Sequence, residues 1–130
     1  MLAIGFQMLW IPGVLPGLNE MLALMNRNRH QYNSVKKKIQ AEIVYRCMEQ
    51  GIKPVESASF LFTWVEKGRR RDPDNIVAGR KFILDALVSG KYLPGDGWRY
   101  VLGFEDQWEV RRDEPGVYVR ISEVRKEKQP

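Results

Sequence analysis

The chain has 130 residues, which is enough for one domain with a modest core and too few for two. Hydrophobic residues make up 44% and charged residues 28%, a composition typical of globular proteins that excludes disorder for most of the chain. Lys and Arg outnumber Asp and Glu by 21 to 16, and the formal charge of +5 permits phosphate contacts with nucleic acid without proving them.

Cysteine and histidine are too rare for a zinc cluster or an intrachain disulfide, since Cys47 and His30 are the single examples of each. A reducing, cytoplasmic setting fits this composition. The apolar segment 1–18 has no basic n-region and is interrupted by Pro12-Gly13 and Pro16-Gly17. We therefore expect a buried strand there, and no signal peptide or membrane span.

The first half of the chain predicts a strand, a loop and a helix. Residues 2–11 are rich in Leu, Ile, Phe and Trp and stop at Pro12-Gly13, as a strand does. Residues 14–29 are irregular and predict a loop or partly ordered stretch. Residues 36–50 have the apolar period of a helix, with an N-cap at Asn33-Ser34 and a stop at Gly51. The opposite face of this helix is basic, with Lys36, Lys37, Lys38 and Arg46.

The second half predicts a strand, a helix and two further strands. Residues 57–66 alternate and predict a strand covered on both faces, and residues 73–88 predict a helix that leads into a loop at 90–97. Residues 98–110 and 117–124 predict a hairpin whose connection, Glu114-Pro115-Gly116, suits a type II turn. The order β-α-β-α-β-β predicts a small single α/β (α+β) domain with a mixed sheet over residues 1–124, followed by a charged tail at 125–130.

The segment Arg69-Arg70-Arg71-Asp72-Pro73-Asp74-Asn75 carries the densest charge in the chain. Asp72 precedes a proline at the first position of a helix, so the simplest interpretation is helix capping, which stabilises by about 0.5–2 kcal/mol. A cap needs one carboxylate, however, and this turn supplies two. The three arginines could neutralise them, or could form a phosphate-binding rim around a cation site.

A cation site is the alternative interpretation, because strand-to-helix junctions are where open α/β sheets place their ligands. Mg²⁺ takes hard oxygen ligands and usually keeps several waters, so two or three carboxylates suffice. Asp96, in the loop Gly95-Asp96-Gly97, is the candidate for a third carboxylate, although an ordinary turn residue explains it as well.

Lys81 shares a helical face with Asp74 and Asp85, at positions i, i+7 and i+11 from Asp74. Its ammonium could reach a phosphate bound near Asp74. A surface ion pair with Asp85, worth about 0.3–0.5 kcal/mol, is the alternative.

In these motifs the chain resembles the RusA family of Holliday junction resolvases of bacteria and their prophages. The resemblance rests on residues 69–75, on Lys81-Phe82-Ile83-Leu84-Asp85-Ala86-Leu87 and on the loop at Asp96. It implies a RusA-like nuclease domain, active as a homodimer, that cuts four-way DNA junctions symmetrically in recombination or repair. It implies Mg²⁺, or Mn²⁺ as a substitute, and neither a small-molecule cofactor nor a membrane partner.

The resemblance also implies roles for individual residues. Asp72, Asp74 and Asp96, from one or both subunits, match the family's three metal-binding aspartates, and Lys81 matches its catalytic lysine. DNA contacts are expected from a basic set and one amide: Arg69, Arg70, Arg71, Asn75, Lys36, Lys37 and Lys38.

The chain departs from the family at two places. Gly95 stands where many members have a second acidic residue, and the helix holds extra residues between Asn75 and Lys81. A non-catalytic protein that binds branched DNA with the same fold is the alternative function. A structural protein whose acidic turn only caps a helix is a third class.

Overall fold

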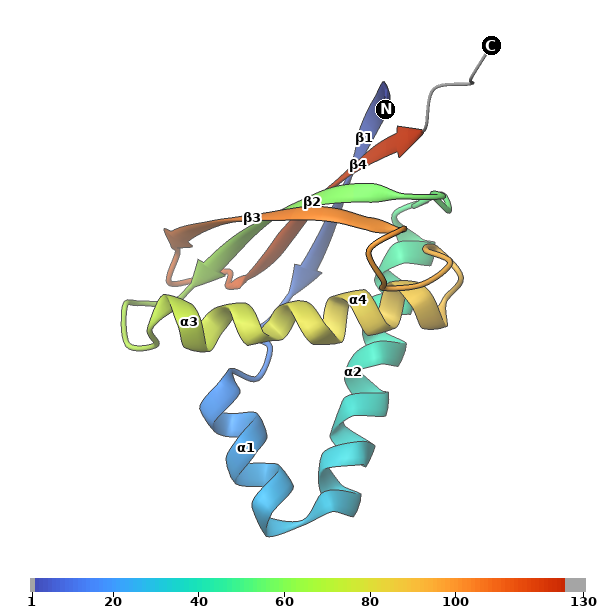
Figure 1. The fold of residues 1–130 in the computed structure, drawn as a ribbon. Coiled ribbons are helices and arrows are strands. Elements are labelled where there is room, and N and C mark those ends of the chain that lie inside the picture. Colours follow the sequence, from blue (N-terminus) through green and yellow to red (C-terminus); the bar gives the residue numbers. More distant parts are fainter. Residues whose placement is uncertain (1, 126–130) are drawn as a thin grey trace.

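The computed structural model describes residues 2–125, with side chains from residue 5 onward, and forms one sheet with helices packed against it (Figure 1). The predicted order of elements is confirmed, with one additional helix. Residues 126–130 of the predicted tail lie outside the described residues. The elements are β1 (Leu2–Pro12), α1 (Leu18–Arg27), α2 (Arg29–Glu49), β2 (Ala58–Glu66), α3 (Pro73–Ile76), η1 (Val77–Gly79), α4 (Arg80–Ser89), β3 (Val101–Val110) and β4 (Gly116–Arg125).

The predicted mixed sheet is confirmed, with the strand order β1-β4-β2-β3. Strand β3 runs parallel to β2, whereas β4 is antiparallel to both β1 and β2. A parallel pair requires a crossover, which α3, η1 and α4 supply as one nearly continuous helical run. We call this run, Pro73–Ser89, the crossover helix.

The predicted hairpin of β3 and β4 is wrong, because the two strands do not pair with each other. Strand β4 lies between β1 and β2, where Val117, Val119 and Ile121 are buried. Strand β3 is mostly exposed and carries the polar residues Glu105, Asp106, Gln107 and Glu109, which suits the edge of the sheet. The inner position goes to the strand whose apolar residues share one face and pack beside Phe60, Phe62 and Trp64 of β2.

The predicted type II turn is also wrong, because Gly116 lacks the positive φ that its third position requires. Gly116 is instead the first residue of β4. A Cβ at this position would collide with the Trp10 ring and the Ile11 carbonyl. Glycine is needed there because β1 passes so close.

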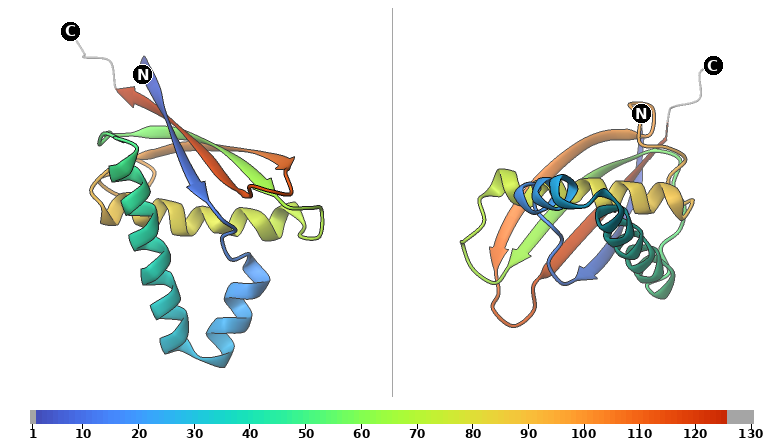
Figure 2. Two further views of the ribbon diagram at one scale, coloured as in Figure 1. Left: turned by 180° about the vertical axis from the view of Figure 1, so that it is seen from behind. Right: turned by 90° about the horizontal axis from the view of Figure 1, so that it is seen from below.

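The helices all lie on one face of the sheet (Figure 2). The prediction that β2 is covered on both faces is wrong for most of the strand: Phe60, Phe62 and Trp64 are buried beneath the helices, whereas on the other face Leu61 and Thr63 are half-buried and Val65 alone is fully buried. The core also includes Leu9 and Ile11 of β1, Ile43 and Cys47 of α2, and Phe82, Ile83 and Leu87 of α4.

Helix α1 occupies part of the segment that we predicted as a loop. None of its side chains is fully buried, and Met21 is its one residue that packs against the core. Helix α2 begins at Arg29 and not near Lys36, because Asn28 caps it by accepting a hydrogen bond from the Gln31 amide (3.1 Å). Together α1 and the first half of α2 project away from the sheet (Figure 1). Over residues 2–125, none of these helices has the length and apolarity that crossing a bilayer requires.

Cys47 is buried on α2, and burial raises the pKa of its thiol to about 12. The thiol of an unfolded chain ionises at pH ~8.5, so above this pH the unfolded state loses its proton first. The free energy of unfolding therefore falls as the pH rises towards 12. We expect native Cys47 to react with a thiol reagent at pH 8 at least ~100-fold more slowly than in urea. Equal labelling rates, followed by absorbance, would contradict the buried position.

Candidate functional site

The acidic turn, residues Asp72–Asn75, lies at the carboxyl ends of the two parallel strands. It follows β2 and begins the crossover helix, so it sits at the edge of the sheet where α/β folds bind ligands. Figure 1 shows this turn at one end of the crossover helix and the loop before β3 at the opposite end.

Asp72 occupies the N-cap position, yet its side chain makes no capping hydrogen bond. Its backbone carbonyl accepts from the amides of Asn75 (3.0 Å) and Ile76 (3.1 Å). Asp74 is exposed, and its Oδ1 accepts from the Asn75 amide (2.9 Å). Capping therefore does not engage the Asp72 carboxylate, and both aspartates present oxygen atoms to solvent.

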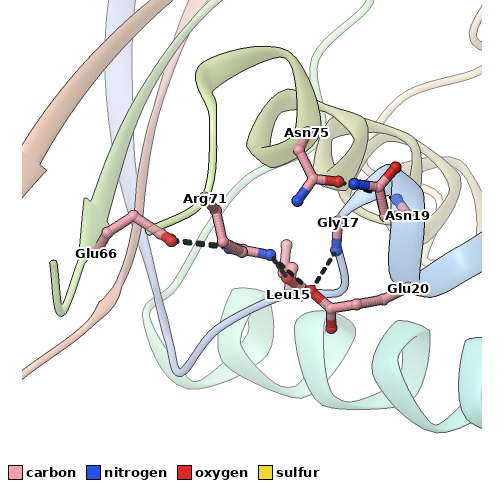
Figure 3. Close-up of polar contacts among 7 residues, drawn as sticks. All are labelled: Leu15, Gly17, Asn19, Glu20, Glu66, Arg71 and Asn75. Carbon is pink, nitrogen blue, oxygen red and sulfur yellow. Dashed lines mark hydrogen bonds and ion pairs between the residues drawn. The ribbon is translucent and has the colours of Figure 1, made fainter. Parts of the chain in front are cut away.

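Arg71 anchors the acidic turn to three other segments (Figure 3). Its Nε and Nη2 donate to the two carboxylate oxygens of Glu66, each at 2.9 Å, and its Nη1 donates to the Leu15 carbonyl (2.9 Å) and to Glu20 (3.3 Å). The hydrogen bond to Glu66 raises the pKa of the Arg71 guanidinium. Only 17% of the Arg71 side chain is exposed, so it holds β2, the loop before α1 and the acidic turn together.

Asn75 connects the same turn to the start of α1. Its Oδ1 accepts from the Asn19 amide (2.9 Å), as a side-chain cap of α1 supplied from another helix (Figure 3). A Cβ at Gly17 would lie 2.7 Å from that Oδ1, so a larger residue there would displace the Asn75 amide. The position of α1 and the conformation of the acidic turn thus depend on each other.

A groove of about 590 Å³ opens beside Asp72. Its apolar wall comprises Pro73, Ile76, Trp108 and Val110, and its polar wall includes Glu66 and Asp72. We call it the Asp72 groove. Trp108 and Val110 lie on the edge strand β3 and are 44% and 48% exposed.

Asp96 and Lys81 lie together beside the far part of the crossover helix. The Nζ of Lys81 is 3.0 Å from Asp85 Oδ1 and 3.8 Å from Asp96 Oδ2. Lys36 reaches the other oxygen of Asp85 at 3.2 Å, so Asp85 bridges two lysines. The hydrogen bond to Asp85 is the main cause of the raised pKa of Lys81. The structure thus contains the Lys81–Asp85 ion pair that we considered as the alternative.

The structure does not bring Asp96 to Asp72 and Asp74 within one chain. The crossover helix has 17 residues, Pro73 to Ser89, and spans about 25 Å at the usual rise per residue. The parallel pairing of β2 and β3 places Asp96 and Asp72 at opposite edges of the sheet, because Asp96 precedes β3 whereas Asp72 follows β2. Among the described residues, no three His, Cys, Asp or Glu side chains are close enough to share a metal ion.

The remaining predicted DNA contacts are distributed over both ends. Arg69 and Arg70 are exposed beside the acidic turn and form no ion pair within residues 5–125. Lys37 and Lys38 are exposed on α2, whereas Lys36 is engaged with Asp85. Phosphate binding by these residues, and by Arg71 and Asn75, stays a prediction; the donors of Arg71 are already engaged inside the chain.

Three acidic residues near the crossover helix were missed from the sequence. Glu66 and Glu20 hold Arg71, and Asp106 on β3 accepts from Trp64 Nε1 (2.9 Å) and pairs with Arg80 (3.2 Å). Asp106 lies two residues from both Phe104 and Trp108, so the alternation of a strand places it on the same face as these rings, towards the helix. The shared partner of Glu20 and Glu66 is Arg71, which is distant in sequence from Glu20 and lies beyond a loop from Glu66, so no local pattern signals either pair.

Comparison with known proteins adds no assignment. No protein-family model matches the chain, and no curated protein matches it.

Proposed function

We propose that this protein is a Mg²⁺-dependent endonuclease that cuts four-way DNA junctions as a homodimer. The observation that carries the proposal is the acidic turn: two exposed carboxylates at the carboxyl edge of the parallel strands, one of them at a cap position that it does not use. The exposed Arg69 and Arg70 beside it supply positive charge for a phosphodiester.

The carboxylates of Asp72 and Asp74 fit a hard divalent cation, because Mg²⁺ is commonly held by one or two carboxylates and retained waters. When bound, such an ion supplies Lewis-acid activation of water and stabilises charge on the phosphate. Arg71 and Asn75 hold the turn that positions the two carboxylates. Arg69 and Arg70 bind and orient the DNA strand.

A complete site with Asp96 and Lys81 would need two chains. Each chain carries Asp72 and Asp74 at one end of the crossover helix, and the Lys81–Asp96 pair at the other. Two chains arranged antiparallel about a twofold axis would place each end beside the opposite end of the partner, forming two equivalent sites. Lys81 would then offset charge on the phosphate. Two sites about a twofold axis suit the symmetric cutting of a four-way junction.

The separation of Asp96 from the acidic turn also favours a second candidate, a protein that binds branched DNA without cutting it. A synthetic four-way junction incubated with Mg²⁺ distinguishes the two. Paired nicks with the wild type and none with Asp74→Asn support the nuclease. Binding without nicks by both proteins supports the second candidate, and the absence of binding contradicts both.

Salt dependence tests the phosphate contacts. If about six phosphates are neutralised, the logarithm of the junction affinity falls with the logarithm of salt concentration with a slope near −5. Arg69→Ala should make this slope shallower by about one. Met48→Ala, at an exposed residue on α2, should leave the slope unchanged. Fluorescence anisotropy with a labelled junction measures both slopes. Equal slopes for the Arg69 variant and the wild type would exclude Arg69 from the contact.

A further inference from the structure

Trp98 is the most exposed large apolar side chain in the described part of the protein, at 97%. It follows Asp96 by two residues and lies at a shallow pocket lined by Val101, Leu102 and Phe104. Phe104 is itself 43% exposed, so Trp98 belongs to a continuous apolar surface and is not an isolated side chain. Exposed tryptophans in such surfaces are frequent anchors of protein interfaces.

The Asp72 groove has the properties of a site for such an anchor. At about 590 Å³ it is large enough for an indole ring, and Trp108 and Val110 leave its apolar wall open to solvent. Trp98 cannot enter the groove of its own chain, because β3 separates them: Trp98 precedes this strand, and Trp108 and Val110 end it. A ten-residue strand spans about 33 Å.

We propose that Trp98 of one protomer inserts into the Asp72 groove of a second copy of this chain. This inference rests on the proposed function, since it names the contact that assembles the two-chain site. An antiparallel arrangement of two chains satisfies both grooves at once, giving a closed twofold contact that leaves no anchor unused. Because Asp96 is two residues from Trp98, the inserted ring brings the missing carboxylate to Asp72 and Asp74.

The charges around the anchor and the groove are complementary. Asp96 is 56% exposed on the anchor side, and the exposed Arg69 lies on the groove side. Arg99 adjoins the anchor, while Glu109 adjoins the groove and is 46% exposed. An insertion that places Asp96 at the acidic turn also leaves it near Arg69 of the partner, and Arg99 can then approach Glu109. Charges of both signs on each side favour a second copy of the chain as the occupant of the groove.

Sedimentation velocity over a range of protein concentrations tests the contact. We expect Trp98→Ala to raise the dimer dissociation constant by about 100-fold or more, because each dimer loses two anchors. Val110→Lys, on the groove side, should have the same effect. Met48→Ala removes an exposed apolar side chain from α2 and should leave the dissociation constant unchanged. Circular dichroism and thermal melts establish that all three variants are folded.

A disulfide cross-link tests the geometry independently of affinity. Arg99→Cys and Glu109→Cys in the same chain lie at opposite ends of β3, too far apart for an intrachain bond. Mild oxidation should therefore yield a covalent dimer, which Trp98→Ala abolishes. Buried Cys47 does not compete. A control pair, Arg99→Cys with Met48→Cys, should give no covalent dimer.

Three results would overturn the inference. One is a wild-type protein that remains monomeric up to ~200 µM with and without a four-way junction, far above the dissociation constants of stable dimers. Another is a Trp98→Ala variant that dimerises normally and cross-links normally. The third is a Trp98→Ala dimer that is intact but binds the junction weakly, which would assign Trp98 to base stacking. A Trp98-dependent dimer that never cuts DNA would sustain the contact and refute only the nuclease.

Discussion

Mixing Asp74→Asn chains with Asp96→Asn chains should restore junction nicking to about a quarter of the wild-type rate, although each variant alone is inactive. Half of the randomly assembled dimers are mixed. Each mixed dimer has one site that combines the intact Asp72 and Asp74 of one chain with the intact Asp96 of the other. Its second site contains both defects. The product should be single nicks, without the paired cuts of the wild type.

The matched control is a mixture of Asp72→Asn and Asp74→Asn chains. Both substitutions affect the same end of the crossover helix, so every site in every mixed dimer retains one defect. Nicked and linear forms of a supercoiled cruciform plasmid, separated on a gel, report single and paired cuts. No recovery in the first mixture would mean that Asp96 acts within its own chain or not at all, and recovery in the control would contradict the assignment of Asp72 and Asp74 to one unit.

Arg71→Ala should lower the free energy of unfolding by about 2–4 kcal/mol and also abolish cleavage. The substitution removes a two-pronged hydrogen bond and leaves Glu66, 13% exposed, without its partner. It also releases the Leu15 carbonyl and Glu20, so α1 and the acidic turn lose their common anchor. Urea denaturation measures the loss of stability. Arg71→Lys should recover only part of it, because an ammonium cannot make the paired contact.

Arg70→Ala is the control, since Arg70 is the exposed neighbour in the same arginine run. Its effect on stability should stay within about 0.5 kcal/mol, while its junction affinity falls. If Arg71 bound phosphate instead of anchoring the turn, the two alanine variants would show the same pattern: reduced affinity, a shallower salt slope and unchanged stability.

Local sequence patterns were sufficient for most elements because each depends on its own residues. The alternation around Phe60 and Phe62 predicted β2, and Asp72-Pro73 predicted where the crossover helix begins. Helix α1 was missed because it directly follows the turn residues Pro16-Gly17 and because Gly17, at its N-cap, has no side chain to signal a helix start. The Asn19 amide at its start is bonded by Asn75, a residue remote in sequence.

By itself, the sequence determined the mixed α/β composition, the order of the strands along the chain and the exposed acidic turn at a strand-to-helix junction. Only the tertiary structure decided that β4 lies at the centre of the sheet and β3 at its edge, because burial of Val117, Val119 and Ile121 outweighs the short connection between the two strands. Tertiary structure likewise decided the place of Asp96. A parallel strand must start at the same edge as its neighbour, so the loop before β3 lies a full helix length from the turn after β2.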